Sequence, residues 1–153
     1  MKENWKNLIT AIAIPLAAGS LSALLAKDGI SSFSTITKPP LTPPAAVFPI
    51  IWTILYILMG IASYLVIMKN PDEKALSLYG LQLLFNFFWS IWFFRFGWYL
   101  FAFFWLIALW LLILATILAF FRISRPAGYL MLPYLIWVTI AGYLNLGVYL
   151  LNP

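Results

Sequence analysis

The charged residues of this 153-residue chain are spaced so unevenly that they leave five long stretches without any charge. These stretches are Leu8–Ala26, Pro39–Met68, Ala75–Phe94, Phe96–Phe121 and Pro126–Pro153. Each is close to or longer than the roughly 20 residues that an α-helix needs to cross the hydrocarbon core of a bilayer. The spacing therefore predicts five transmembrane helices.

The composition indicates that lipid is the main solvent of the protein. Only 8% of the residues are charged and 65% are hydrophobic, whereas about a quarter of the residues of a soluble domain carry charge. Transmembrane β-strands would show short segments of alternating polarity, and that pattern is absent. The first apolar run is too long for a cleavable signal peptide. We therefore expect an all-α membrane protein, with residues 1–153 forming a single domain.

The breaks between the apolar runs place the helices at about 5–26, 45–68, 74–94, 97–121 and 127–151. The turn at residues 95–97 is so short that the third and fourth helices should be antiparallel neighbours. The connection 27–44 is long and ends in paired prolines, which favour a stiff, extended course. We interpret this first loop as a lid on a ligand site. A simple spacer, or a proline-rich ligand for a soluble domain, remains the alternative.

The basic residues predict the orientation of the chain in the membrane. With five alternating helices, six bases fall on the side of the N-terminus: Lys2, Lys6, Lys69, Lys74, Arg122 and Arg125. Three fall on the other side: Lys27, Lys38 and Arg95. Because cytoplasmic loops are enriched in Lys and Arg, we expect a cytoplasmic N-terminus and an outside C-terminus. The net charge of +5 thus reflects topology, and nucleic-acid binding is not expected.

Several kinds of chemistry are disfavoured by what the sequence lacks. The chain has no Cys and no His, so disulfides are excluded, and the usual soft or imidazole ligands of metals and haem are missing. We expect neither a metal nor a protein-held cofactor. No acid lies within a predicted span, which disfavours acid–base catalysis, proton relays and ion pumping.

Three predicted helices carry aromatic and polar stripes at helical spacing. The stripes are Trp52, Tyr56, Met59 and Ser63; Gln82, Asn86, Trp89, Ser90 and Phe93; and Trp137, Ala141, Leu144 and Val148, with Asn145 slightly to the side of the last. Unpaired amides are costly in hydrocarbon, so Gln82 and Asn86 should point into the bundle. Two interpretations remain open: a ligand site around Trp52, Asn86 and Trp137, or helix-joining polar residues with core aromatics. Small residues in the first helix, including Gly19 and Ala23, allow close packing or leave room for a flat ligand.

These residues resemble the signature of a known family. Lys38-Pro39-Pro40…Pro43-Pro44 followed by Trp52…Tyr56…Met59-Gly60…Ser63 resembles the first loop and second helix of the translocator protein family, TspO/MBR or peripheral-type benzodiazepine receptor. Gln82…Asn86…Trp89…Gly97-Trp98 is similar to its third helix and following turn, and Pro133…Trp137…Ala141…Leu144-Asn145 to its fifth helix. The matches occur in order in a chain of the right length.

The resemblance implies a five-helix bundle, usually a homodimer, with a pocket under the first loop. It implies binding of porphyrins such as protoporphyrin IX and of isoquinoline carboxamide or benzodiazepine drugs. The matching pocket positions are Gly19, Ala23, Phe48, Trp52, Asn86, Trp89, Trp98, Trp137, Ala141 and Leu144, to which we add Tyr56 and Ser90 from the stripes. The animal cholesterol motif is not matched, because Leu146 replaces its Tyr and no base follows Tyr149. Short termini favour a bacterial cell-membrane protein.

Three functional hypotheses follow. The first is a tetrapyrrole-binding protein that senses, sequesters or transports porphyrin. The second is a light- or oxidant-dependent porphyrin-degrading enzyme that uses Trp52 and Trp137, whose indoles can donate electrons. The third is a membrane scaffold whose partners bind the first loop. A product spectrum after illumination separates the first two, and a pull-down without the loop tests the third.

Overall fold

The computed structural model describes residues 2–29 and 35–152, so residues 30–34 of the expected lid lie outside the described part. It is all-helical there, as predicted. Within the described residues, five helices are long and apolar enough to cross a membrane. Their bounds are Lys2–Leu25 (α1), Val47–Lys69 (α3), Glu73–Ser90 (α4), Tyr99–Ile123 (α5) and Arg125–Leu151 (α6). The chain is thus a multi-pass membrane protein.

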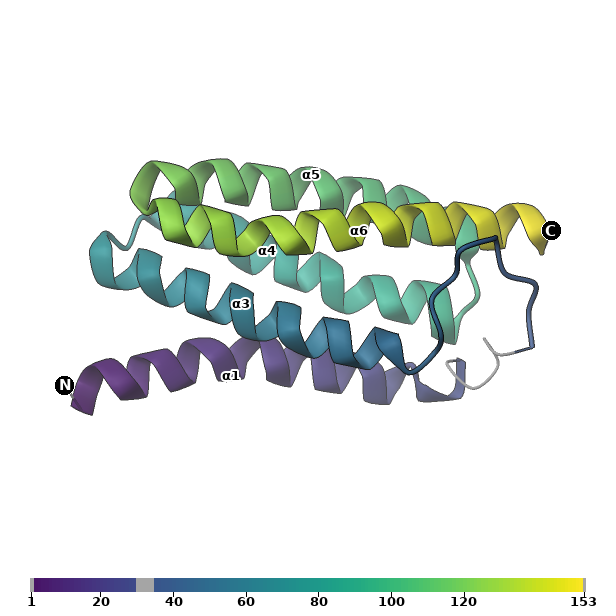
Figure 1. The fold of residues 1–153 in the computed structure, drawn as a ribbon, viewed down its shortest axis with the longest axis horizontal. Coiled ribbons are helices and arrows are strands. Elements are labelled where there is room, and N and C mark those ends of the chain that lie inside the picture. Colours follow the sequence, from purple (N-terminus) through teal and green to yellow (C-terminus); the bar gives the residue numbers. More distant parts are fainter. Residues whose placement is uncertain (1, 30–34, 153) are drawn as a thin grey trace.

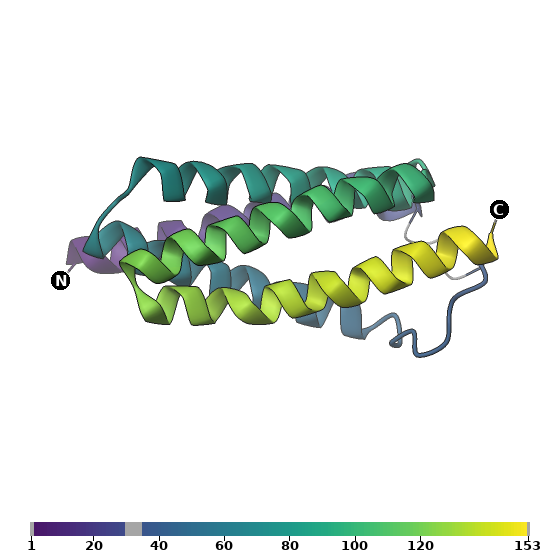
Figure 2. The same ribbon diagram turned by 90° about the horizontal axis from the view of Figure 1, so that it is seen from above.

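The helices pack around a shared interior (Figures 1 and 2). Contacts run from α1 to α3, from α3 to α6, from α6 to α5, from α5 to α4 and from α4 back to α1. The predicted antiparallel pairing of the helices that flank residues 95–97 is therefore present as α4 and α5. The N-terminus and the C-terminus lie at opposite ends of the bundle, and the first loop covers the end near the C-terminus (Figure 1).

Short turns at the N-terminal end of the bundle are fixed by side-chain caps. The Asp72 carboxylate accepts the backbone N–H of Ala75 at 3.0 Å, and the Ser124 hydroxyl accepts that of Ala127 at 3.4 Å. Each cap satisfies one of the backbone donors that a helix start leaves without an intrahelical partner. These caps explain why α4 and α6 each begin directly after the break.

The turn between α4 and α5 differs from the sequence-based boundaries. The α-helical pattern stops at Ser90 and continues as a π-helical turn, η1 (Ile91–Arg95). In it, the Phe96 N–H donates to the carbonyl oxygen of Ile91 at 3.1 Å. Gly97 then adopts a φ of 63°, which glycine reaches without a Cβ penalty. The wider turn and the left-handed residue reverse the chain, so α5 begins at Tyr99 and not at Gly97.

The α1–α3 contact depends on a glycine. A Cβ built on Gly60 would lie 2.6 Å from the Ile12 Cα and 2.7 Å from the Ala11 carbonyl oxygen. Both neighbours are backbone atoms, which cannot rotate away. The absence of a side chain at Gly60 therefore sets how closely α1 approaches α3, as small residues commonly do between membrane helices.

A candidate ligand-binding cavity

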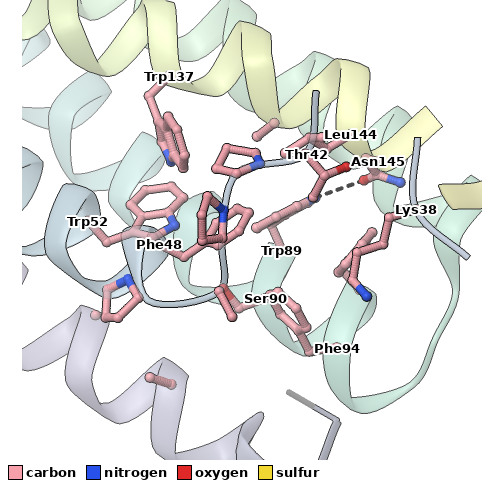
Figure 3. A pocket seen from close by; sticks show the side chains of 18 of the residues that line it. Lys38, Thr42, Phe48, Trp52, Trp89, Ser90, Phe94, Trp137, Leu144 and Asn145 are labelled. Carbon is pink, nitrogen blue, oxygen red and sulfur yellow. Dashed lines mark hydrogen bonds between the residues drawn. The ribbon is translucent and has the colours of Figure 1, made fainter. Parts of the chain in front are cut away.

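A cavity of about 590 Å³ lies at the end of the bundle that the first loop covers. Its walls come from α1, α3, α4, η1, α6 and the loop, and no described residue of α5 lines it (Figure 3). The lining residues are Gly19, Ala23, Lys38, Thr42, Pro43, Pro44, Ala45, Phe48, Pro49, Trp52, Tyr56, Trp89, Ser90, Phe93, Phe94, Trp137, Ala141, Leu144 and Asn145. The volume is in the range of small-molecule sites.

Aromatic rings from α3 and α6 form one wall of the cavity. The Trp52 ring stacks on Tyr56 with centroids 5.6 Å apart and meets Trp137 edge to face at 6.4 Å. Phe48 makes a similar edge contact with Trp137 at 5.6 Å. The buried indole N–H of Trp137 donates to no acceptor among the described residues. This wall offers flat π faces and apolar edges to a ligand.

A polar network lies behind this wall. The Tyr56 hydroxyl donates to Asn86 Oδ1 at 3.0 Å, and Asn86 Nδ2 donates to the Tyr134 hydroxyl at 2.7 Å. Tyr134 in turn donates to Gln82 Oε1 at 2.7 Å. All four side chains are buried, which confirms that Gln82 and Asn86 point inward. The network joins α3, α4 and α6 and holds Tyr56 in place in the aromatic wall.

A second bonded group supports the opposite wall. The Trp89 indole N–H donates to Asn145 Oδ1 at 3.0 Å, as the dashed line in Figure 3 shows. Asn145 Nδ2 donates to the Tyr99 carbonyl oxygen at 2.8 Å. Because Asn145 is engaged at both ends of its amide, it fixes the Trp89 ring and ties α6 to the start of α5.

The described part of the first loop is fastened to α6. The backbone N–H of Thr37 donates to Asn152 Oδ1 at 3.1 Å, and Asn152 Nδ2 donates back to the Thr37 carbonyl oxygen at 2.7 Å. The Tyr143 hydroxyl donates to the Pro40 carbonyl oxygen at 2.7 Å. We call this set of contacts, together with the packing of Pro39 on Gly147, the loop clamp. It holds residues 37–40 over the mouth of the cavity.

The structure brings most of the sequence-predicted site residues together. Gly19, Ala23, Phe48, Trp52, Tyr56, Trp89, Ser90, Trp137, Ala141 and Leu144 line the cavity. Asn86 and Trp98 are not among the lining residues. Asn86 lies one layer deeper, because both polar atoms of its amide bond tyrosine hydroxyls. Trp98 is 51% exposed and stacks on the rings of Trp92 and Phe96 outside the cavity.

Some lining residues were not among the predicted site residues. Lys38, Thr42, Pro43 and Pro44 come from the loop, for which helical periodicity gives no facing direction. Asn145 lies slightly to the side of the α6 stripe, yet it lines the cavity and bonds Trp89 there. The small residues Gly19 and Ala23 of α1 also line the cavity, and Gly19 abuts the Tyr56 ring.

The fold and the cavity define a class: helical multi-pass membrane proteins with an aromatic, ligand-sized cavity under a loop at one end. The profile of the TspO/MBR family matches residues 11–151. The chain therefore belongs to the TspO/MBR family, as the sequence motifs predicted.

Curated relatives cover nearly the whole chain. The tryptophan-rich protein TspO of Chlorobaculum tepidum is 37% identical over 158 residues, covering 100% of both chains. The tryptophan-rich sensory protein of Cereibacter sphaeroides is 37% identical and covers 99% of this chain and 95% of its own length. The translocator protein of Bos taurus is 31% identical, covering 95% and 89% respectively. Membrane sensory and translocator proteins are thus the relatives of this chain.

Proposed function

We propose that this protein binds a tetrapyrrole, with metal-free protoporphyrin IX as the natural type of ligand, in order to sense, sequester or transport it. The observation that carries the proposal is the cavity of about 590 Å³ with aromatic walls at the covered end of the bundle. A flat conjugated ring can stack on the faces of Trp52 and Trp89 while Gly19 and Ala23 leave room beside it. Isoquinoline carboxamide and benzodiazepine-type drugs, which carry several aromatic rings, are proposed as ligands of the same cavity.

An optical titration tests this proposal. Protoporphyrin IX is added in darkness to the purified protein in lipid nanodiscs, and the porphyrin absorbance and the quenching of tryptophan fluorescence are followed. We expect a saturable change that is weakened by Trp52→Ala, which removes a wall of the cavity. The control is Trp110→Ala, because Trp110 lies on α5 and lines no part of the cavity. A linear change identical to that of empty nanodiscs contradicts the proposal.

A second candidate function is light- or oxidant-dependent degradation of the bound porphyrin. It is favoured by the position of two oxidisable indoles, Trp52 and Trp137, whose ring centroids are 6.4 Å apart and which both line the cavity. Such side chains can donate electrons to an excited ring, with dioxygen as the final oxidant, and need no acid–base residue. The test is a mass spectrum of the porphyrin after illumination in air, compared with darkness and with protein-free nanodiscs.

We further propose that the protein is a homodimer in a bacterial cell membrane, with the N-terminus in the cytoplasm. Ile9 and Leu24 of α1 are 63% and 62% exposed in the single chain and must be covered by lipid or by protein, so α1 is one face that a partner chain could cover. The mass of the protein in nanodiscs, measured by light scattering or native mass spectrometry, distinguishes a dimer from a monomer.

A further inference from the structure

A groove of about 310 Å³ lies on the outside of the bundle, between α3 and α6. Its lining residues are Ile51, Ile54, Leu55, Leu58, Pro133, Ile136, Trp137 and Ile140. All of these side chains are apolar, and they belong to two of the membrane-spanning helices. Ile54 and Ile136 are 52% and 63% exposed in the single chain, so the groove opens toward the hydrocarbon of the bilayer.

Trp137 lies between this groove and the ligand cavity. Among the described residues, it is the one that lines both. Its neighbours on α6 divide between the two spaces, because Ile140 lines the groove and Ala141 lines the cavity. Figure 3 shows the Trp137 ring reaching from α6 toward Trp52. The ring is thus a partition between the cavity and the membrane-facing groove.

This partition is tied down less firmly than Trp89, the other deeply buried tryptophan of the cavity. The indole N–H of Trp89 is bonded to Asn145, whereas that of Trp137 has no acceptor among residues 2–29 and 35–152. One turn earlier, Pro133 cannot donate to the carbonyl oxygen of Tyr129, so α6 lacks one backbone bond there. The Trp137 ring can therefore turn aside without breaking a side-chain hydrogen bond in the described part of the chain.

The covered end of the bundle offers a different route, and it is fastened by polar contacts. There the loop clamp joins residues 37–40 to Tyr143 and Asn152 of α6 through hydrogen bonds. A ligand that passes beneath these residues has to release those bonds. In the groove, by contrast, Trp137 is the one lining side chain that has a hydrogen-bonding group at all.

We infer that the α3–α6 groove is an entry site, at which uncharged flat aromatic ligands bind from the bilayer before they pass Trp137 into the cavity. This inference rests on the proposed ligand binding and adds a route and a charge class to it. An apolar molecule that is dissolved in lipid loses no hydrogen bond when it enters this groove. Charged groups are costly in hydrocarbon, so the entry site selects neutral ligands.

Filling the groove from the lipid side tests the route. Ile54→Trp and Ile140→Trp each add bulk at an exposed position that lines the groove and not the cavity. The matched control is Leu118→Trp on α5, at a position that is 55% exposed and lines neither space. The probe is a radiolabelled isoquinoline carboxamide. Its association and dissociation rate constants and its equilibrium dissociation constant are measured with the protein in nanodiscs.

We expect each groove variant to lower both rate constants by the same factor, roughly threefold to tenfold, because an obstructed path raises the barrier between unchanged end states. The equilibrium dissociation constant should stay at the wild-type value, and Leu118→Trp should match the wild type throughout. Wild-type rates in both groove variants, or unequal changes in the two rate constants, overturn the inference while ligand binding stands. If the wild type does not bind the carboxamide at equilibrium, the proposed ligand site fails and the inference fails with it.

A crosslink across the loop clamp tests the alternative route. Because the chain has no Cys, a Pro40→Cys/Tyr143→Cys double variant can be joined selectively by a short bis-maleimide. The covalent tie then replaces the hydrogen bond between these two exposed residues. We expect the same rate constants before and after crosslinking. Slower association and dissociation after crosslinking would mean that the loop has to lift, which overturns the inference.

Two tryptophan variants test the partition itself. Trp137→Leu removes the ring between the groove and the cavity, whereas Trp52→Leu removes a ring that lines the cavity alone. We expect Trp137→Leu to raise the association rate constant. Trp52→Leu should act mainly on the dissociation rate constant, as loss of a wall contact usually does. Equal association rate constants in the two variants would show that Trp137 is only a wall of the cavity, and the inference would fail.

Discussion

Asn86 gives both ends of its amide to tyrosine hydroxyls, and this decides what its removal would do. Asn86→Ala removes one hydrogen bond from each of the buried hydroxyls of Tyr56 and Tyr134. A buried polar group that loses its partner costs about 1–3 kcal/mol. We expect a lower midpoint in a thermal melt, with a smaller loss of carboxamide or porphyrin affinity caused indirectly through Tyr56.

Ser90→Ala provides the comparison, because Ser90 lines the cavity itself and lies about one turn further along the chain. It should leave the melting midpoint close to that of the wild type. Calorimetric titration with an isoquinoline carboxamide gives the affinities of both variants. An unchanged melt combined with a large loss of affinity in Asn86→Ala would mean that the amide reaches the ligand, contrary to its bonding in the structure.

The two tryptophans of the aromatic wall separate binding from chemistry. Phe keeps much of the apolar contact area of Trp but lacks the N–H and the easily oxidised indole. If the protein degrades porphyrin, Trp52→Phe and Trp137→Phe should each abolish light-dependent product while much of the binding remains. The Trp137 N–H has no acceptor among residues 2–29 and 35–152, so its loss breaks no hydrogen bond within this part of the chain.

The measurement is the rate of product formation at saturating ligand, by absorbance and mass spectrometry. Trp110→Phe serves as the control, since Trp110 bonds Thr139 away from the cavity, and it should behave as the wild type. Product formed at the wild-type rate in both wall variants would show that the tryptophans only form the pocket.

At the scale of helices, Gly60 and Gly80 both lie inside apolar helices but differ in the space around them. Gly60 faces the backbone of α1, whereas an added Cβ on Gly80 meets no atom of the described part of the chain within 4 Å. Gly60→Ala should therefore destabilise the protein by about 1–3 kcal/mol, as overpacking does. Gly80→Ala should be neutral or stabilise by up to about 1 kcal/mol, because Ala favours the helix.

Thermal melts of the two variants in the same detergent measure this difference. The contact between α1 and α3 can be followed separately by the accessibility of a cysteine placed at Ile12, which should rise in Gly60→Ala only. Equal stability of the two variants would mean that α1 shifts freely along α3 and that Gly60 does not set their separation.

The elements differ in how far their structure could be predicted from the sequence. The helices could be predicted from the uncharged runs. In hydrocarbon, a charge or an unpaired backbone group is costly at every residue of a span, so the whole span must be apolar and helical. The stripe residues Trp52 and Trp137 follow from helical periodicity. The π-helical turn at Ile91–Arg95 leaves no such pattern, since it depends on the hydrogen bonds around Gly97. For Asn86, the predicted direction into the bundle is right, but the side chain lies one layer behind the cavity. Helical periodicity gives the direction of a side chain and not its distance from a cavity.

The contacts of the loop could be predicted least. Prolines in residues 37–44 indicate a stiff segment, but the bonds that fix it come from Tyr143 and Asn152, more than a hundred residues further along the chain. The place of Lys38 at the cavity was therefore not predictable from the loop alone. The resemblance to a family indicated a pocket beneath this loop, and the structure places Thr42, Pro43 and Pro44 in its lining.

For the whole molecule, the distribution of bases over the two ends of the bundle determines the orientation that we predict. Lys69 ends α3, Lys74 lies in the first turn of α4, and Arg122 and Arg125 flank the α5–α6 turn. These turns lie at the same end of the bundle as the N-terminus (Figure 1). At the other end, Lys38 faces the cavity, and Arg95 Nη1 donates to the Leu25 carbonyl oxygen at 3.2 Å.

We therefore expect the loop, the mouth of the cavity and the C-terminus to face away from the cytoplasm, because the base-rich end stays inside. A reporter that is active only outside the cytoplasm should work when fused at Pro153 and fail when inserted after Ser124. A reporter that fluoresces only in the cytoplasm should give the opposite pattern at the same two positions. The insertion at Ser124 controls for expression, since it differs from the fusion at Pro153 by one transmembrane span. Cytoplasmic fluorescence of the Pro153 fusion would reverse the orientation and make the cavity open toward the cytoplasm.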